Sequence, residues 1–396
     1  MRILVVLPRF PYPLEKGDKL RAYHQIRILS QTNEVYLFCA DHKLVSDTQI
    51  EALKPFCKDI CVVKQPILEN YKNVVRNYLH SKSLQIGYWD SQRVRKAYRK
   101  FEQKVQPDVV YSQMVRTMPW VSRSQRPKVM DFQDALSMNT ERRMNQAHGL
   151  WHYILHFEFK MLRSSEYNAF KIFDALTIIS DPDGDAIPHR RNREIQVIPN
   201  GVDTNYFKSN NADKQYDVVF CGNMNYPPNI NACKYLLKKV MPLVWREMPE
   251  TKVLIAGHTS KKVIWKCASD RVTITGWVDD IRECYDKAKL MAAPMQIGSG
   301  LQNKLLEAMA MHVPCVTTSI ANDSLHATPE KEILIGDTPE QLAAHIMTLL
   351  RNDDQRRQLA QAAYQFVTQN YSWEQNVNKL NQLLLEASSD KSPRLN

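Results

Sequence analysis

The chain has 396 residues, which is more than one ordinary hydrophobic core and suits two domains. Apolar residues make up 44% and charged residues 24%, which excludes a disordered protein, and the longest apolar runs are far shorter than the ~20 residues that span a bilayer. The net charge is +11: residues 1–200 carry 31 Lys or Arg against 21 Asp or Glu, and the remainder carry 22 against 21.

The N-terminus has one charge and a short apolar run, followed at once by Pro8 and Arg9. This pattern predicts a first strand rather than a signal peptide. The eight cysteines are scattered, and only Cys57 and Cys61 lie close together, without the two-residue spacing of a redox or zinc site. A reducing cytoplasm is the expected location.

Short β-branched runs alternate with longer helix-like segments. Each run is almost continuously apolar, which is typical of strands buried on both faces of a parallel sheet. The pattern predicts an α/β fold with two Rossmann-like, doubly wound parallel sheets, whose ligands bind at the carboxyl ends of the strands. The strands expected in the first half are Ile3–Leu7, Val35–Ala40, Ile60–Val63, Val109–Ser112, Val129–Phe132, Leu176–Ser180 and Gln196–Ile198. Those expected in the second half are Val218–Gly222, Val253–Gly257, Val272–Gly276, Met291–Pro294, Cys315–Thr318 and Ile333–Ile335.

Polar and turn-forming residues between Asn200 and Tyr216 interrupt this periodicity and mark a domain boundary. We expect a first domain over residues 1–200 and a second over 201–372. Residues 373–396 are expected to form a helix that packs back toward the first domain, followed by a disordered tail.

Most of the net positive charge of the first half lies between Lys64 and Lys104, where ten basic residues stand against three acidic ones. Tyrosines and a tryptophan are interleaved with them. This combination suits an anionic membrane surface, a polyanionic acceptor or nucleic acid. The alternative is one or two solvated helices without a partner.

Several other polar groups have a structural and a functional interpretation. Lys19, Arg21 and His24 open the first helix, where a role at a phosphate or acceptor and a solvated face are equally compatible with the sequence. The acidic run Asp181–Asp185 predicts a turn and a helix start, because it lacks the closing Glu of a calcium loop. Asp279 and Asp280 predict the first turn of a helix, so no metal site is expected.

The most specific local motif is the glycine-containing stretch Gly298–Gly300 followed by a helix that carries Lys304 and Glu307. Glycines allow close backbone approach, and the helix end offers unpaired N–H groups and the positive end of its dipole, which suits a phosphate. Lys304 adds a positive charge there, and Glu307 lies on nearly the same helix face. The alternative is that the glycines only turn the chain and Glu307 is a surface charge.

The segment Lys304–Ala310, followed by Val313–Val316, resembles the donor-binding motif of the retaining glycosyltransferases of family four. These enzymes have the GT-B architecture, in which two Rossmann-like domains face each other across a cleft. Val197–Asp203 resembles their crossing into the second domain, and Ile274–Val278 resembles their mid-domain strand and loop. The chain also resembles a bacterial subgroup associated with exopolysaccharide synthesis, at the segments Pro11–Pro13, Gly17–Lys19, Tyr226–Asn229 and Gln302–Lys304.

The resemblance implies metal-independent, retaining transfer of a sugar from a nucleotide-diphosphate sugar to a glycan or lipid-linked acceptor. Glu307 would bind the donor ribose, and amides around Gly300 and Leu301 would hold the diphosphate. Gly17, in the loop after the first strand, would let the backbone approach the same phosphates. No cofactor is expected, and no nucleic-acid partner. The full expected donor site is Gly17, Asn223, Gly298, Ser299, Gly300, Leu301, Gln302, Asn303, Lys304 and Glu307.

The chain departs from the family pattern at two places. Ser299 stands where the family usually has the first of two glutamates, so the carboxylate expected near the transferred sugar is missing and the sugar is left open. Asn223–Asn225 replaces the usual Arg and Lys after the first strand of the donor domain. Lys304 is then the expected source of positive charge at the leaving phosphate.

Three residues are candidates for catalysis. Negative charge develops on the leaving phosphate, so preorganised donors around it contribute most, and Lys304 fits that role. Retention in the family is thought to involve front-face attack in which the leaving phosphate helps to remove the acceptor proton. Asp134, and after it Asp131, occupies the place in chain order where many relatives carry a His or Asp facing the sugar. Either could instead cap the following helix.

We therefore expect a cytoplasmic glycosyltransferase of bacterial exopolysaccharide or cell-surface polysaccharide synthesis, peripherally bound to the anionic inner membrane through the basic stretch Lys64–Lys104. Two other functions stay open. One is another enzyme with two Rossmann-like domains, such as a sugar-nucleotide epimerase or a phosphorylase. The other is a basic module for membrane or nucleic acid with a degenerate site.

Overall fold

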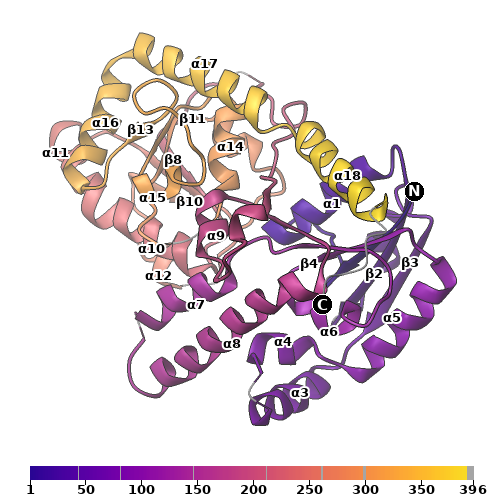
Figure 1. Ribbon diagram of the computed structural model, residues 1–396. Coiled ribbons are helices and arrows are strands. Elements are labelled where there is room, and N and C mark those ends of the chain that lie inside the picture. Colours follow the sequence, from indigo (N-terminus) through magenta and orange to yellow (C-terminus); the bar gives the residue numbers. More distant parts are fainter. Residues whose placement is uncertain are drawn as a thin grey trace. The chain divides into compact units, whose positions relative to one another are not determined.

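The computed structural model describes residues 1–42, 44–80, 82–145, 147–210, 212–259, 262–297 and 300–389. They form two compact units (Figure 1). Unit 1 consists of residues 1–199 together with the last helix, α18 (Trp373–Ser389), and unit 2 consists of residues 200–372. The tail expected after that helix lies outside the described residues.

Unit 1 contains a seven-stranded parallel sheet with the order β3-β2-β1-β4-β5-β6-β7. All seven strands expected from the first half of the sequence are present, with their ends shifted by one or two residues. The strands are β1 (Arg2–Leu7), β2 (Glu34–Asp41), β3 (Asp59–Lys64), β4 (Val109–Gln113), β5 (Lys128–Asp131), β6 (Ala175–Ile178) and β7 (Gln196–Val197). The helices are α1 (Gly17–Leu29), α2 (Asp47–Glu51), α3 (Ile67–Leu79), α4 (Leu84–Trp89), α5 (Gln92–Val105), α6 (Met118–Val121), α7 (Leu136–Asn145), α8 (Leu150–Ile172), α9 (Asp181–Ala186) and α18, with 3-10 turns η1 (Val115–Thr117) and η2 (Asn192–Glu194).

The sheet of unit 1 is covered on both faces because successive side chains of a strand point in opposite directions. Ile3 and Val5 of β1 belong to one core cluster, which also contains buried residues of α1 and α18. Leu4 and Val6 belong to the other, which contains buried residues of α5, α6 and α8. This two-sided burial explains why the strands read as continuous apolar runs.

Unit 2 contains a six-stranded parallel sheet with the order β10-β9-β8-β11-β12-β13. All six strands expected from the second half are present. They are β8 (Tyr216–Cys221), β9 (Val253–Ala256), β10 (Val272–Ile274), β11 (Ala288–Ala293), β12 (Cys315–Thr317) and β13 (Leu334–Ile335). The helical segments are α10 (Pro227–Tyr235), the π-helical turn η3 (Leu236–Val240), α11 (Met241–Glu247), α12 (Lys262–Trp265), α13 (Arg282–Asp286), α14 (Asn303–Ala310), α15 (Ser319–Asn322), α16 (Pro339–Arg351) and α17 (Asp353–Asn370).

Each sheet has one point where the strand order reverses. In unit 1 this switch lies between β1 and β4, and in unit 2 it lies between β8 and β11. Ligands of doubly wound sheets bind beside the switch, at the carboxyl ends of the strands. The two candidate sites described below lie at these two points.

No helix in the described part of the chain is both long enough and apolar enough to span a bilayer.

Candidate functional site

The backbone around the switch point of unit 2 is closely packed. Gly257, which follows β9, has a φ of +120°, and a side chain there would place its Cβ 2.2 Å from the carbonyl oxygen of Gly222. A Cβ on Gly222 would in turn lie 2.8 Å from the side-chain nitrogen of Asn229. Only glycine allows this approach of two strand ends. The loop after β8 is thereby held against the loop after β9.

Asn223 lies in this loop, directly after Gly222. Its Oδ1 atom accepts a hydrogen bond of 2.9 Å from the amide of Asn225, and its carbonyl oxygen accepts one of 3.1 Å from the side chain of Asn229. The predicted donor residue Asn223 therefore shapes the loop through its own side chain and backbone.

Helix α14 starts where the sequence predicts a phosphate-binding helix end. Gly300 has a φ of +72°, which is strained for any residue except glycine and turns the chain into the helix. Leu301 is buried and anchors this turn in the core of unit 2. Gln302 precedes the helix in an extended conformation, and its side chain does not cap the helix end. The predicted site residues Gly298 and Ser299 lie outside the described residues.

Lys304 lies in the first turn of α14 and reaches across the switch point. Its Nζ donates to the Oε1 of Gln302 at 2.8 Å and lies 5.9 Å from the centre of the Phe220 ring in β8. Burial lowers the pKa of Lys304 to about 8, although Glu307 acts in the opposite direction. Lys304 is therefore a cation close to its titration point at neutral pH.

Glu307 lies one turn further along α14, on the same side as Lys304. Its Oε2 accepts a hydrogen bond of 2.9 Å from the hydroxyl of Tyr285 in α13. Burial raises the pKa of Glu307, whereas the Tyr285 hydrogen bond and Lys304 act to lower it. Because each carboxylate oxygen can accept more than one hydrogen bond, Glu307 keeps capacity for a ligand hydroxyl.

Asn303, the first residue of α14, has a partner at the start of unit 2. The side chain of Asn200 donates to its Oδ1 atom at 3.0 Å. Asn200 itself is buried. The pair thus connects the first residues of unit 2 to α14, which gives Asn303 a structural role.

Trp277 is a further candidate for contact with a ligand. In the sequence it belongs to the motif Ile274–Val278, which gave it no role of its own. It follows Gly276, whose φ of +70° turns the chain at the end of β10, and its side chain is 61% exposed. Its ring centre lies 6.2 Å from that of His258, which follows β9. Two exposed rings at neighbouring strand ends offer a stacking surface to a planar ligand. The sequence feature that indicates this position is the consecutive pair Gly276 and Trp277 at the end of an expected strand.

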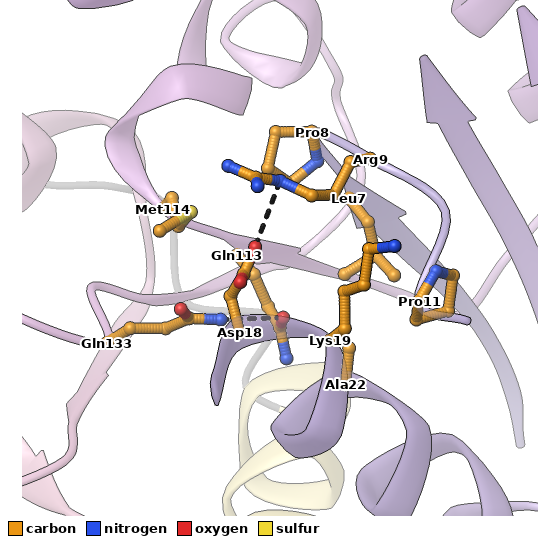
Figure 2. Close-up of a pocket in the computed structure, with 10 residues that line it drawn as sticks. All are labelled: Leu7, Pro8, Arg9, Pro11, Asp18, Lys19, Ala22, Gln113, Met114 and Gln133. Carbon is orange, nitrogen blue, oxygen red and sulfur yellow. Dashed lines mark hydrogen bonds and ion pairs between the residues drawn. The ribbon is translucent and has the colours of Figure 1, made fainter. Parts of the chain in front are cut away.

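Unit 1 has a pocket at its own switch point (Figure 2). Arg9 lies over the pocket and pairs with Asp18 of α1, with 3.0 Å between the Arg9 Nε and the Asp18 Oδ2. Lys19 of α1 lines the same pocket. The lining residues are Leu7, Pro8, Arg9, Pro11, Asp18, Lys19, Ala22, Gln113, Met114 and Gln133.

The floor of this pocket is a buried polar network. Gln133 Nε2 donates to Gln113 Oε1 at 2.9 Å (Figure 2), and Gln113 Nε2 donates to Gln25 Oε1 at 2.5 Å. Met114 and Gln133 have φ angles of +65° and +63°, which are uncommon for these residue types. Such strain persists only where the surroundings fix it and clusters at functional sites. Sequence reasoning missed this network, although polar residues inside the apolar run of β4 signalled it.

Asp131 belongs to this network rather than to the pocket surface. It is the last residue of β5, is fully buried, and lies 2.6 Å from the Nε of Arg21, which is 1% exposed. The hydroxyl of Tyr111 lies 3.0 Å from the same carboxylate oxygen. Asp131 lies within the strand expected from the sequence, and its carboxylate is paired inside the core instead of capping the following helix or facing the pocket.

Asp134 lies beyond the end of β5 and is only partly buried. None of the described residues donates a hydrogen bond to its carboxylate. Burial raises its pKa to about 7, and the negative charge of Asp183 adds to that effect, whereas Arg21 opposes it. Helix α7 begins two residues later, at Leu136. Of the two predicted aspartates, Asp134 has the carboxyl group that a ligand could reach.

The first turn of α1 differs from the expectation in two respects. Gly17 is the first residue of the helix rather than part of the preceding loop, and no side chain in the described part of the chain caps this helix end. Arg21 and His24 are buried, since Arg21 pairs with Asp131 and His24 stacks on Trp373 with 4.6 Å between ring centres. A solvated face is therefore wrong for both.

The acidic runs form helix starts. Asp181 and Asp183 lie in the first turn of α9, and Asp280 accepts from the amide of Arg282 at the start of α13. Among the described residues, no three His, Cys, Asp or Glu side chains gather as a metal site would require.

Comparison with known proteins gives a family for part of the chain. Residues 215–352 match the family model described as glycosyl transferases group 1. An uncharacterised 44.6 kDa protein in the cps region of Klebsiella pneumoniae is 24% identical over 385 residues, which cover 93% of this chain and 96% of the relative.

Solved structures resemble the whole chain. Sucrose-phosphate synthase from Thermosynechococcus elongatus superposes with a TM-score of 0.71 at 14% identity, covering 97% of this chain and 98% of its own. Anabaena HepE in complex with UDP and glucose gives 0.69 at 15% identity, covering 96% and 99%. Staphylococcus aureus TarM in complex with fondaparinux, α-GlcNAc-glycerol and UDP gives 0.69 at 13% identity, covering 97% and 99%.

These likenesses confirm the α/β fold with two Rossmann-like parallel sheets. Residues 215–352 match the model of the group 1 glycosyl transferases, and the solved structures resemble the chain in fold.

Proposed function

We propose that the protein is a retaining glycosyltransferase that moves a sugar from a nucleotide-diphosphate sugar to a glycan or lipid-linked acceptor. The observation that carries this proposal is the start of α14, where an uncapped helix end, Lys304 and Glu307 come together at the switch point of unit 2. The match of residues 215–352 to group 1 glycosyltransferases supports it.

The donor diphosphate is proposed to bind the amides at the start of α14. These N–H groups lack intrahelical partners and lie at the positive end of the helix dipole. Lys304 adds a full charge in a partly water-excluded place, where electrostatic stabilisation of the leaving phosphate is stronger than in water. Glu307, oriented by Tyr285, is proposed to accept hydrogen bonds from the ribose hydroxyls.

Unit 1 is proposed to hold the acceptor in the pocket between Arg9, Lys19 and Gln113. Asp134 is proposed to face the transferred sugar, where an ionised carboxylate would stabilise the positive charge that develops on the ring. Because the acceptor proton is proposed to leave with the departing phosphate, the scheme needs no enzymic nucleophile.

The biological setting is proposed to be bacterial exopolysaccharide or cell-surface polysaccharide synthesis in the cytoplasm. The relative in the cps region of Klebsiella pneumoniae supports this setting. We also propose reversible contact with the anionic inner membrane through unit 1, because the excess charge of +10 in residues 1–200 attracts anionic lipids, while the rest of the chain carries +1.

Two substitutions test the donor site. Glu307→Gln and Lys304→Met each remove one charge while keeping side-chain size. Loss of a charged hydrogen-bond partner costs roughly 1.5 to 3 kcal/mol, so we expect about ten- to a hundredfold weaker binding. Isothermal titration with UDP, UDP-glucose and GDP-mannose measures the affinity, and hydrolysis of the sugar that binds measures turnover.

Glu283→Gln is the matched control. Glu283 is an exposed carboxylate of α13 that pairs with Lys287 at 3.1 Å, outside the proposed site. This variant should bind the nucleotides as the wild type does. If Glu307→Gln and Lys304→Met also keep wild-type affinity for a nucleotide sugar that the protein uses, the donor site has been assigned wrongly.

A further inference from the structure

In helix α3 the distribution of side chains is the reverse of that expected for a surface helix of a water-soluble protein. Its buried side chains are the amides Asn70, Asn73 and Asn77, whereas its apolar side chains face outward. Leu68 and Leu79 are 78% and 75% exposed. A surface helix normally buries its apolar stripe and exposes its polar one. The exposed apolar residues of α3 are Ile67, Leu68, Tyr71, Val75, Tyr78 and Leu79, and together they are named the α3 surface.

The packing of α3 on α4 fixes this orientation. A Cβ on Gly87 of α4 would lie 2.7 Å from the Cβ of Asn77, so the two helices approach as closely as glycine allows. The side chain of Asn77 donates to the carbonyl oxygen of Asn73 at 2.8 Å within the contact. Glu69 accepts a hydrogen bond from Ser91 at the start of α5. The outward direction of the apolar side is therefore built into the unit.

Helix α8 extends the α3 surface. The rings of Tyr78 and Phe157 are in contact, with 5.0 Å between their centres. Leu150 and Tyr153 lie seven and four residues before Phe157, on the same side of α8, and are 75% and 72% exposed. Figure 1 shows α3, α4 and α8 together at one end of unit 1. An exposed apolar area that spans two elements marks an interaction site.

The charges beside the α3 surface favour an anionic bilayer over a second copy of the chain. Lys72 is exposed and borders the apolar side of α3, and Lys82 follows the helix. Arg76 instead donates to the carbonyl oxygen of Asp90 at 2.9 Å and lies 4.0 Å from its carboxylate. The only acidic residue of α3 is Glu69, which is already bonded to Ser91. A symmetric dimer would place Lys72 and Lys82 against their own copies, whereas anionic headgroups neutralise them.

We propose that the α3 surface and the first turns of α8 insert into the headgroup and acyl boundary of an anionic membrane. Tyr71, Tyr78 and Tyr153 combine an apolar ring with a polar tip, which is the chemistry of residues at a membrane-water boundary. Lys72 places its stem beside the apolar side and its charge at headgroup level. The inference rests on the membrane contact in the proposed function and replaces a purely electrostatic contact with insertion.

The basic face of α5 makes a different contribution. Its apolar residues Val94, Tyr98 and Phe101 are buried in the core of unit 1, so only its charges are available to a membrane. Attraction through charges alone is screened by salt within roughly 8 to 10 Å. Insertion of apolar side chains is not. Salt therefore separates the two kinds of contact.

The test uses flotation of the full chain with vesicles of phosphatidylglycerol and phosphatidylethanolamine, or of phosphatidylcholine alone, at low and high salt. Leu68→Gln with Leu79→Gln removes two exposed leucines without touching the core. Leu44→Gln with Leu385→Gln is the matched control, because both leucines are exposed on other elements. Thermal unfolding should be unchanged in both.

We expect the wild type to bind anionic vesicles and to keep part of this binding at high salt. The α3 variant should bind at least about tenfold more weakly, since full insertion of a single leucine changes the affinity by about tenfold or more. The control should bind as the wild type does. If salt abolishes wild-type binding and the α3 variant binds normally, insertion is rejected while electrostatic contact stands. If sedimentation shows that the substitutions only dissociate a dimer, the membrane assignment is wrong.

Nucleotide binding distinguishes this inference from the proposed function. Both double variants should bind the nucleotides as the wild type does, because the donor site lies in unit 2. Loss of vesicle binding with donor binding intact confirms the inference. Intact insertion in a protein that binds no nucleotide sugar would overturn the proposed donor function instead.

Discussion

The carboxyl group of Asp134 combines a cost in stability with a proposed role in the reaction. Its acidic neighbours include Asp183, Asp131 and Asp18, and its cationic neighbours include Arg116 and Arg21, of which Arg21 is already paired with Asp131. Burial and the acidic neighbours raise its pKa to about 7. A carboxyl group that titrates near neutral pH beside a pocket is a functional-site candidate, because active sites shift pKa values in this way.

The same shift makes a prediction about stability. Between about pH 4 and pH 7 the folded protein holds a proton on Asp134 that the unfolded chain has released, so the free energy of unfolding falls as the pH rises through this range. Asp134→Asn removes the cost. We expect the variant to be more stable than the wild type by on the order of 2 kcal/mol at pH 8.

At pH 5 the difference should be smaller, because the folded wild type is then protonated at Asp134. Urea unfolding of both proteins at the two pH values measures it. A wild type that is equally or more stable at pH 8 would contradict the raised pKa. Sugar transfer should also rise as the pH passes 7 if the ionised form of Asp134 acts in the reaction.

Residue types and chain order predicted these two aspartates but could not separate them. Asp131 and Asp134 lie three positions apart in the sequence, yet Asp131 is paired with Arg21, which lies 110 positions away in the chain. Pairing over such a distance depends on the register of β5 and on the direction of α1. The sequence alone fixes neither.

At the scale of elements, the strands were predictable because both faces of each sheet are buried. A strand buried on both sides needs apolar residues at nearly every position, and this signal is local. Helix α3 was not predictable in the same way. Its sequence predicts an amphipathic helix but does not show which side is buried. The close contact with Gly87 of α4 places the asparagine side inward.

The loops of the proposed donor site contain glycines that are needed because a side chain would not fit, and this gives a second prediction. Gly257→Ala would place a Cβ 2.2 Å from the Gly222 carbonyl oxygen at a φ of +120°. We expect a loss of more than about 3 kcal/mol in the free energy of unfolding, because both the contact and the backbone angle are unfavourable. Chemical denaturation followed by tryptophan fluorescence measures it.

Gly149→Ala is the matched control for this prediction. Gly149 also has a positive φ, of +60°, but a Cβ there meets no atom within 4 Å. It should therefore cost only the roughly 1 to 3 kcal/mol of an unfavourable backbone conformation. Equal losses in the two variants would show that the close approach of Gly222 and Gly257 has no energetic consequence.

At the scale of the whole molecule, the proposed chemistry depends on charge from amides and Lys304 rather than from a metal ion. We expect sugar transfer or donor hydrolysis to continue in excess EDTA, because a helix end and a lysine can stabilise a leaving diphosphate without a cation. Turnover measured with and without EDTA checks this. Complete loss that Mn²⁺ restores would instead require a Lewis-acid role for a metal.

The position of α18 in the sequence decides when unit 1 can complete its folding. The amide of Val202 donates to the carbonyl oxygen of Tyr371 at 2.8 Å, so the two ends of unit 2 lie side by side. Trp373, Val377 and Leu380 of α18 then complete the core around β1 and α1 of unit 1. Unit 1 cannot complete its core until α18 has been synthesised, so the part of its sheet that α18 covers stays exposed while residues 200–372 leave the ribosome. The folding of unit 1 is therefore coupled to the synthesis of unit 2, and the exposed apolar surface is open to misfolding or aggregation during that interval.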